Sequence, residues 1–568
     1  MYFYGHCILM DNKTISRTFK LLSQLMELHD VNQFKTRSIA NAAFKLDKLP
    51  FALEGKSFDE LSKIDGIGKS LATKIIELVE TGSIAEMEEL VADTPPGVME
   101  MMNLKGIGPK KIAVIWRELG IENMGELFYA CNENRLIEAK GFGLKTQEEI
   151  RKAIEYRMAA DGKFLYAQVE PLAEDLYERI KTILPDALVE FGGEYRRRCE
   201  VISELIVVIG SRNPEVAIEA LKQAEVLANL TQNKDHLNGE ITNGILVDLI
   251  CVTKAEYHRE LFISTGNNLH VEAVFNRINE ADDIPESEEL IYHKANLQWI
   301  HPEMREGIDY LEKAERHQLP ELIKLADLKG SLHNHSTWSD GVNTLEEMAL
   351  YCRDQLQLEY LGICDHSKTA VYAKGLSIER VQQQWAEIDS LNQKIENFHI
   401  FKGIESDILS DGSLDYPEEI LKGFDFVVAS VHSNLKMDEE KATARLLKAI
   451  ENPYTTILGH PTGRLLLSRK GYEINYTKVI DACAANNVVI EINANPRRLD
   501  LDWRWYNYAL SKGATLSINP DAHRNEGFLD MKYGVLVARK GGVSKASCLN
   551  TLSRAEIEQR FKSKKANL

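Results

Sequence analysis

The sequence predicts a multidomain protein with an α-helical N-terminal region, an α+β middle region and a C-terminal α/β barrel of seven β/α units. Three observations lead to this prediction: a Gly-x-Gly turn repeated between helices, a strand-rich middle segment, and alternating short strands and helices from Asp327 onward. A chain of 568 residues has room for about four domains. Its 44% hydrophobic and 27% charged residues are typical of folded globular proteins.

The composition indicates a soluble cytoplasmic protein. No apolar run approaches the ~18 residues of a membrane span, and the opening MYFYGHCILM lacks the charged region and cleavage site of a secretion signal. This opening differs in character from the polar helix start at DNKTIS, so both Met1 and Met10 are candidates for the natural start. Eight cysteines occur singly, which predicts reduced thiols and neither a disulfide framework nor a zinc ribbon.

The net charge of −18 argues at first against a nucleic-acid partner, because phosphate-binding surfaces are usually basic. The charge is uneven, however. Residues 1–160 contain 21 Lys and Arg against 23 Asp and Glu, a net of −2, which leaves −16 for the rest of the chain. We therefore expect DNA at the N-terminal region and assign part of the acidity behind it to metal ligands.

Three copies of a helix–turn–helix pattern begin at Leu61, Met101 and Leu136, and resemble the helix-hairpin-helix motif. A Gly-x-Gly turn exposes backbone N–H groups at the start of the next helix, where they can hold a DNA phosphate without reading a base. The alternative is a simple turn between packing helices, which three copies disfavour. The predicted DNA-binding residues are Gly66, Gly68, Lys69, Gly106, Gly108, Lys110, Lys111, Gly141 and Gly143.

The segment Arg37–Pro50 and the first hairpin together resemble the small lyase domain of family X DNA polymerases. In that family a helix lysine forms a Schiff base with an abasic sugar, and Lys74 stands at that position. A lysine on a helix is more often only a solvated charge, so both interpretations of Lys74 stay open.

Residues 162–253 resemble the palm of family X polymerases, in which a Gly-Ser pair grips the triphosphate and three aspartates hold two metal ions. Here the pair is Gly193 and Glu194, Glu204 and Ile206 replace the first two aspartates, and only Asp248 is unchanged. A glutamate at the phosphate position repels the substrate, and isoleucine cannot bind a metal. The resemblance therefore predicts a degenerate palm with polymerase activity lost or impaired.

Seven strands are predicted after Asp327, and each ends in a polar cluster: GSLHNHS, YLGICDHS, FKGIESD, FVVASVHS, TILGHPTG, VVIEINANP and LSINPDAHR. In β/α barrels the functional site lies where the strands end. Of the seven histidines in this region only His399 is away from a strand end. Histidines interleaved with carboxylates at these positions predict a metal site.

This region resembles the polymerase and histidinol phosphatase (PHP) domain, and its ligand positions are matched without substitution by His333, His335, Asp340, His366, Glu405, His432, His460, Asp521 and His523. The resemblance implies up to three divalent ions, with Glu405 as a bridge; the donors suit Mn²⁺, Zn²⁺ or Fe²⁺ and leave Mg²⁺ open. Such ions turn a bound water into the attacking hydroxide, so no protein nucleophile is required. Asn493, Asn495 and Arg497 are candidate substrate contacts or, alternatively, loop hydrogen-bonding residues.

The resemblance to bacterial family X polymerases covers essentially the whole chain. The expected domains are a lyase-like domain with the first hairpin (1–85), a helix-hairpin-helix subdomain (86–160), a degenerate palm (161–255), a C-terminal polymerase subdomain with a linker (256–325) and the PHP domain (326–568). The expected function is a 3′–5′ exonuclease in DNA repair, with cleavage at abasic sites as an addition. Alternatives are a bifunctional gap-filling polymerase and exonuclease, a small-molecule phosphatase, and a DNA-binding scaffold with a structural metal site.

Overall fold

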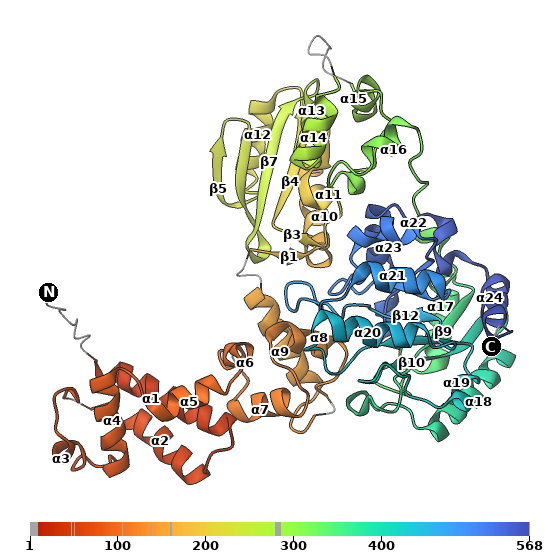
Figure 1. Ribbon diagram of the computed structural model, residues 1–568. Coiled ribbons are helices and arrows are strands. Elements are labelled where there is room, and N and C mark those ends of the chain that lie inside the picture. Colours follow the sequence, from red (N-terminus) through yellow and green to blue (C-terminus); the bar gives the residue numbers. More distant parts are fainter. Residues whose placement is uncertain are drawn as a thin grey trace. The chain divides into compact units, whose positions relative to one another are not determined.

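The computed structural model describes residues 10–566, except residues 47, 50, 105, 138, 159–161 and 279–285. The chain forms two compact units, Met1–Ile154 and Glu155–Leu568, and each is described by itself (Figure 1). The division falls within the last helix of the expected helix-hairpin-helix subdomain. Among the described residues, no helix is long and apolar enough to cross a membrane.

The first unit is helical, as the sequence predicts. Its helices begin at capping residues where the sequence offers them: Asp11 accepts from Thr14 N–H, and Ser57 forms a capping box with Glu60. The core of residues 10–90 forms around buried side chains such as Phe19, Leu22 and Ile75. The helices are α1 (Asn12–Leu28), α2 (Gln33–Leu46), α3 (Phe58–Leu61), α4 (Lys69–Thr81), α5 (Ala85–Ala92), α6 (Pro96–Met101), α7 (Pro109–Arg117), α8 (Met124–Asn132) and α9 (Leu144–Met158).

The second unit begins with a five-stranded mixed sheet of order β2-β4-β7-β6-β5, beside a two-stranded β1-β3 ribbon. Strands β4 and β7 run parallel at its centre and place Ile206 opposite Asp248. The strands are β1 (Phe164–Leu165), β2 (Leu188–Phe191), β3 (Val201–Ile202), β4 (Glu204–Ser211), β5 (Ala228–Asn233), β6 (His236–Ile241) and β7 (Ile245–Thr253). The helices here are α10 (Tyr166–Ile183), α11 (Gly193–Arg196) and α12 (Pro214–Gln223).

A helical segment comes after the sheet and has its own small core around Phe262, Tyr292 and Ile300. Its helices are α13 (Tyr257–Thr265), α14 (Asn268–Phe275), α15 (Glu288–Lys294) and α16 (Leu311–Glu315). Ion pairs join this segment and the preceding sheet to the last part of the chain: the buried Lys540 pairs with Glu306 at 2.5 Å, and Lys532 pairs with Glu170 at 2.6 Å.

The C-terminal part is a parallel sheet in which each strand pairs with its sequence neighbours, in the order β14-β13-β12-β11-β10-β9-β8. The strands are β8 (Gly330–Ser331), β9 (Tyr360–Ile363), β10 (His399–Asp407), β11 (Phe426–Ser430), β12 (Ile457–Leu458), β13 (Val489–Asn493) and β14 (Leu516–Asn519). Its helices are α17 (Leu345–Asp354), α18 (Ile378–Lys394), α19 (Glu418–Leu421), α20 (Glu439–Ile450), α21 (Tyr476–Ala485), α22 (Tyr506–Ser511), α23 (Met531–Lys540) and α24 (Arg554–Ala566).

The two edges of this sheet meet just beyond the ends of β8 and β14. Asn334 and Ala522 form a parallel bridge there, and the His335 N–H donates to the Ala522 carbonyl at 2.9 Å. The sheet therefore comes close to a closed barrel, and strands such as β9, β11, β13 and β14 are buried on both faces, as parallel strands require. The predicted seven-unit distorted barrel is confirmed. Closure brings the ends of all seven strands to one mouth.

Candidate metal centre and DNA-binding elements

The nine predicted ligands all lie at the mouth of the barrel. They end or come directly after six different strands, because the chain leaves each strand there before entering the next helix. The structure brings all nine into overlapping groups whose ligand atoms lie within 4.8 Å of one another: His335, Asp340, His366 and His523; His333, His460 and Asp521; His333, His335 and Glu405; and His366, Glu405 and His432.

Glu405 lies at the centre of this arrangement. Its Oε1 is 3.0 Å from His460 Nε2 and 3.1 Å from His432 Nε2. Its Oε2 is 2.9 Å from His366 Nδ1. Both oxygens therefore face imidazoles from different strands, which is the position from which one carboxylate can share its oxygens between two ions.

The donor atoms fit a metal cluster better than a purely structural polar network. Both ring nitrogens of His335 and of His366 are buried, and none of them makes a hydrogen bond of acceptable geometry among the described residues, although His366 Nδ1 lies 2.9 Å from Glu405 Oε2. Buried polar atoms are almost always paired, so bound cations would explain these atoms. Burial together with His523 and His366 lowers the pKa of His335 to about 3, which keeps its ring neutral and able to bind a metal at neutral pH.

The carboxylates are also kept in the metal-binding form. Burial alone would raise the pKa of Glu405, but His432, His333 and His366 lower it well below its usual range. The pKa of Asp521 is lowered in the same sense by His333 and His335 against the effect of burial. Ionised carboxylates beside imidazoles are a donor set that suits Zn²⁺, Mn²⁺ or Fe²⁺. Against the effect of burial, Glu405 and Asp407 raise the pKa of His432 to about 9, so a metal ion that binds this ring would displace a proton.

A second layer of carboxylates orients the histidines, and the sequence interpretation missed it. Glu491 on β13 is 2.7 Å from His333 Nδ1 and also accepts the His460 N–H at 2.7 Å. Asp407 at the end of β10 is 2.6 Å from His432 Nδ1. Such partners fix the tautomer and direction of a ligating ring. The signal in the sequence is a single carboxylate inside an otherwise apolar buried strand, as in VVIEIN.

The first two helix-hairpin-helix turns have the geometry that phosphate binding requires. Gly66 and Gly106 adopt φ of 86° and 92°, which disfavours any residue with a Cβ. Gly68 and Gly108 are the N-caps of α4 and α7, and neither helix has a side-chain cap. A Cβ at Gly68 or Gly108 would meet nothing within 4 Å, so the space in front of these helix ends is open.

The third turn has the same backbone signature at Gly141, with φ of 88°, and open space at Gly143. Lys69 and Lys110 are exposed beside the first two turns, although Lys110 also lies 3.8 Å from Glu27. Lys111 is partly turned away, with its ammonium 5.4 Å from the Phe142 ring. The three turns therefore offer backbone N–H groups at helix starts, with lysines next to two of them.

Comparison with known proteins finds two matching domain families in the N-terminal region and a relative that aligns with nearly the whole chain. A helix-hairpin-helix domain family matches residues 10–84, and a SAM-like helix-hairpin-helix tandem family matches residues 98–155. The DNA polymerase/3′-5′ exonuclease PolX of Bacillus subtilis is 34% identical over 571 aligned residues, which span 97% of this chain and 99% of that protein. The chain belongs to the PolX family.

Smaller proteins match part of this PolX chain. A probable phosphatase of Thermoanaerobacter sp. is 31% identical over 188 residues, 31% of this chain and 74% of that protein. A probable phosphatase of Caldanaerobacter subterraneus is 39% identical over 105 residues, 18% of this chain and 39% of that protein. Part of the chain is thus similar to probable phosphatases, whereas nearly the whole chain is similar to a DNA polymerase and exonuclease.

In the palm of this PolX chain the carboxylates contact neighbouring protein groups, whereas those in the barrel belong to the cluster of metal donors. Glu194 accepts the Ser203 N–H at 2.7 Å, and Asp248 lies 2.8 Å from His236 Nδ1. Partial burial and the nearby carboxylates of Asp248 and Glu194 raise the pKa of Glu204. Among the described palm residues, no three carboxylate or histidine donors come close enough to hold a metal ion.

Ile206 takes the place of the second metal-binding aspartate that the family resemblance leads us to expect. It packs against the Gly192–Gly193 turn, where a Cβ on Gly193 would lie 3.0 Å from Ile206 Cδ1. The arginines after this turn are also engaged: Arg196 binds Glu288 through both terminal nitrogens, at 3.0 and 2.6 Å. The palm of this PolX chain is therefore packed with internal contacts at the positions that the family resemblance assigns to metal and triphosphate.

Lys74 is mostly buried in this PolX chain and does not extend freely into solvent. Its Nζ lies 2.7 Å from Glu86 Oε2, and Lys35 binds the other oxygen of Glu86 at 2.5 Å. Two ammonium groups are thus held around one carboxylate. Its lyase role remains a prediction.

The predicted substrate contacts after β13 separate into two kinds. Asn493 is buried and donates to Asp521 Oδ2 at 3.2 Å, so it supports a ligand from beneath. Asn495 and Arg497 lie on the loop that follows β13. The Asn495 side chain accepts the Arg497 N–H at 3.1 Å. Arg498, which the sequence interpretation did not select, is buried with its Nε 4.0 Å from Asp521 Oδ2.

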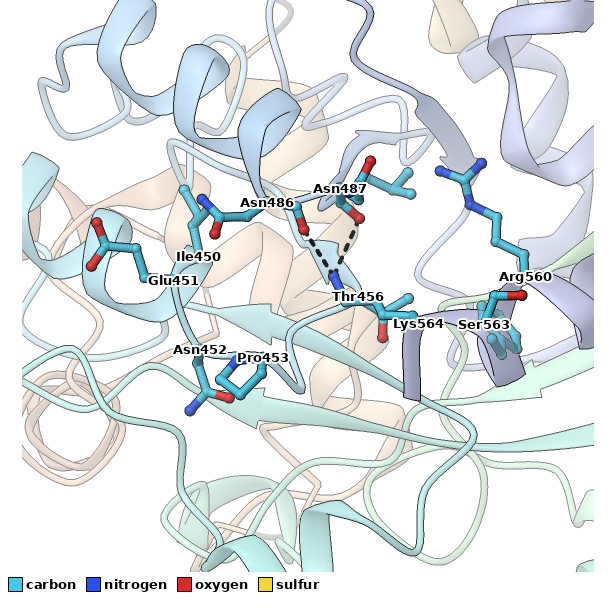
Figure 2. A pocket seen from close by; sticks show the side chains of 12 residues that line it. Ile450, Glu451, Asn452, Pro453, Thr456, Asn486, Asn487, Arg560, Ser563 and Lys564 are labelled. Carbon is cyan, nitrogen blue, oxygen red and sulfur yellow. Dashed lines mark hydrogen bonds between the residues drawn. The ribbon is translucent and has the colours of Figure 1, made fainter. Parts of the chain in front are cut away.

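Two hollows of the barrel lie outside the cluster itself. One hollow has a volume of about 790 Å³ and is lined by the loop that follows His460 and contains Arg464, Leu467 and Lys470. Another, of about 400 Å³, lies at the opposite end of the strands between α20, α21 and α24 (Figure 2). In it Lys564 donates to the carbonyls of Asn486 and Asn487 at 3.4 and 3.2 Å. This lysine caps the C-terminal end of α21, as cations commonly do.

Proposed function

We propose that this PolX chain is a DNA-binding phosphodiesterase that removes nucleotides from DNA 3′ ends at the mouth of its barrel. The observation that supports this best is the cluster of nine donors around Glu405 in a chain that also contains three helix-hairpin-helix turns. The nine residues are proposed as the metal ligands, Glu405 as the bridge, and the hairpin glycines as the phosphate-binding elements.

Each group at the centre has a separate task in this proposal. Bound divalent ions would supply a nucleophile from water and neutralise the scissile phosphate. Glu491 and Asp407 hold His333 and His432 in fixed orientations. Arg498 adds positive charge beside Asp521, which would help to balance the charge of a bound phosphate. None of these tasks requires a protein nucleophile.

The hairpins would hold the DNA that the centre hydrolyses. N–H groups at the starts of α4 and α7 contact phosphates whatever the base sequence, so the protein would bind DNA without sequence preference. This also explains how a chain of net charge −18 binds a polyanion, because the positive ends of helices contribute without net charge. We also propose the five domains with the bounds given above, and a lyase role for Lys74.

A bifunctional polymerase and exonuclease is the second candidate, and the comparison supports it at least as well. Similarity extends over 97% of this chain to a protein named as both a DNA polymerase and a 3′–5′ exonuclease. Against it stand Ile206 and Glu194 in the palm, since they replace a ligand and place a negative charge beside the triphosphate position. A small-molecule phosphatase is the third candidate, supported by similarity to a probable phosphatase over 31% of this chain.

One assay separates these candidates. A 3′-recessed duplex, labelled at the 5′ end of the recessed strand, is incubated with Mn²⁺ with and without dNTPs, beside a His333→Ala variant. We expect the wild-type chain to shorten the strand under both conditions and the variant to leave it intact. Shortening by the variant would contradict the assigned centre. Growth of the strand with dNTPs would instead establish the bifunctional enzyme, and hydrolysis of small phosphomonoesters without DNA shortening would establish the phosphatase.

A further inference from the structure

A hollow of about 400 Å³ lies at the end of the barrel opposite the metal-ligand cluster (Figure 2). Part of its wall comes from residues of 450–456 and 486–489, where the chain leaves α20 and α21 and enters β12 and β13. Helix α24 lines another side with Arg560, Phe561 and Lys564. We call this space the α24 hollow. Its volume lies within the roughly 300–1,000 Å³ of pockets that hold small molecules.

Two basic side chains line the α24 hollow without an acidic partner. Arg560 and Lys564 are four residues apart on one helix, so they lie on the same face, and like charges at that spacing destabilise a helix. Glu451 also lines the hollow, but it is exposed. No carboxylate of the described residues affects the pKa of either cation. The hollow is therefore positively charged in a chain whose net charge is −18.

The hydrogen bonds of these cations within the protein leave donors unused. A guanidinium has five N–H donors, and in the described part of the chain Arg560 makes one hydrogen bond, from Nη2 to Thr515 Oγ1 at 3.1 Å. Lys564 donates to the carbonyls of Asn486 and Asn487 at 3.4 and 3.2 Å, as the dashed lines in Figure 2 show. Capping of α21 explains the position of Lys564. It does not explain why a second cation, with most of its donors unused, lies one helical turn away.

The surroundings also make both positive charges less stable than they are in water. Burial lowers the pKa of Arg560. Burial and the positive charge of Arg560 lower the pKa of Lys564 to about 8. A lowered pKa of a basic group means that its charged form is disfavoured at that place. An anion bound in the hollow would stabilise both cations.

We propose that the α24 hollow binds a small organic phosphate, whose phosphate contacts Arg560 and Lys564 and whose apolar part lies against Phe561 and Val489. Guanidinium and ammonium groups are the side chains that bind phosphate oxygens best. Phe561 and Val489 are buried and supply apolar surface beside the two cations. The inference does not rest on the proposed function, because the hollow shares no residue with the metal-ligand cluster.

The test uses the full chain and three probes: inorganic phosphate, deoxyadenosine monophosphate and deoxyadenosine. The monophosphate joins a phosphate to a flat ring with apolar faces, and deoxyadenosine lacks only the phosphate. Hydrogen exchange followed by mass spectrometry reports on peptides from α24 and from residues 486–489. The probe concentration that gives half of the protection in these peptides is a local Kd, which binding at the metal centre does not alter.

Four proteins are compared. The double variant Arg560→Gln with Lys564→Gln removes both cations. The matched control Arg554→Gln with Lys562→Gln makes the same change of charge at two exposed positions of the same helix. Ser563→Glu adds a carboxylate at an exposed position that lines the hollow, so it tests the inference even if the double variant does not fold. The wild type is the reference.

We expect both phosphate probes to slow exchange in α24 of the wild type, the monophosphate at the lower concentration, and deoxyadenosine to have no effect. The local Kd should rise about 100-fold in the double variant, because one charge-assisted hydrogen bond is typically worth about tenfold or more. Ser563→Glu should weaken binding in the same direction. The control should match the wild type.

Three results would overturn the inference. The first is unchanged exchange in α24 with both phosphate probes. The second is a local Kd that neither the double variant nor Ser563→Glu alters, which would place the ligand elsewhere. The third is an equal local Kd for phosphate and the monophosphate, which would contradict the apolar contact. DNA shortening by the wild type is measured separately, so each of these results would leave the proposed function intact.

Discussion

The barrel mouth and the palm each contain a glutamate among other ionisable side chains. These neighbours shift the pKa of the two glutamates in opposite directions. At the mouth, Glu405 is surrounded by imidazoles that lower its pKa, and its oxygens are directed at places where cations would sit. In the palm, burial and two other carboxylates raise the pKa of Glu204, with Ile206 packed beside it against a glycine turn. In this chain the carboxylates at the barrel mouth lie among histidines that can share a metal ion with them, whereas the described carboxylates of the palm do not.

The largest expected effect contrasts these two glutamates directly. Glu405→Gln should reduce DNA shortening by about 10³-fold or more, because it removes the charge that would bridge two ions, and metal assistance is worth several kcal/mol. Glu204→Gln, the same chemical change in the palm, should leave shortening at the wild-type rate. Strand shortening and metal content by mass spectrometry measure both. Equal losses from the two substitutions would remove the distinction between the regions.

The pH dependence of stability should report on the helical segment between the palm and the barrel. Burial lowers the pKa of His270 to about 4, while its ring lies 2.9 Å from the Gly307 carbonyl and 2.7 Å from Tyr292 Oη. The unfolded chain binds a proton there below about pH 6.5 and the folded chain does not, so stability is lost as pH falls from about 6.5 to 4.

Over that window the loss from His270 is at most about 3 kcal/mol, at 1.36 kcal/mol for each pKa unit. Denaturant unfolding of the wild type at several pH values measures it. His270→Gln should be less stable at pH 7 but should show a shallower dependence on pH. His317→Asn, a change at an exposed histidine, is the control and should keep the wild-type slope. An unchanged slope in His270→Gln would assign the pH dependence to other groups.

A smaller effect is expected beneath the metal centre. Glu491→Gln keeps the size of the side chain but weakens its hold on His333, and substitutions of such supporting residues typically cost 10–100-fold in metal affinity or activity. Metal titration followed by strand shortening at saturating metal would show a raised metal requirement. Glu451→Gln, at the opposite end of the barrel, serves as the control. Wild-type metal affinity in Glu491→Gln would mean that His333 is oriented by other contacts.

The smallest effect concerns DNA binding by the first unit. Gly68→Ala with Gly108→Ala adds two methyl groups in open space and strains neither backbone, since neither glycine has a positive φ. The methyl groups would obstruct phosphates at the starts of α4 and α7, and we expect the Kd for DNA to rise about fivefold. Fluorescence anisotropy measures this, with Gly307→Ala as the control. Unchanged affinity would mean that the hairpins only connect packing helices.

Much of the fold could be predicted from local sequence. The Gly-x-Gly turns at Gly66 and Gly106 have the positive φ that only glycine adopts readily. The glycines in the sequence therefore predict the backbone conformation of these turns. The alternation of apolar strands and helices after Asp327 specified the barrel for a similar reason, because parallel strands buried on both faces read as short apolar runs. The resemblance to one family then assigned the nine donors to their strand ends.

Only the tertiary structure decided which of the remaining polar residues belong to the centre. His333 and Glu491 are separated by 158 residues and meet at 2.7 Å because the sheet nearly closes on itself. The engagement of Lys74 by Glu86 and the packing of Ile206 on the glycine turn likewise depend on contacts between separate elements. Sequence spacing specifies local conformation and strand ends, whereas strand closure and side-chain packing determine which distant groups share one site.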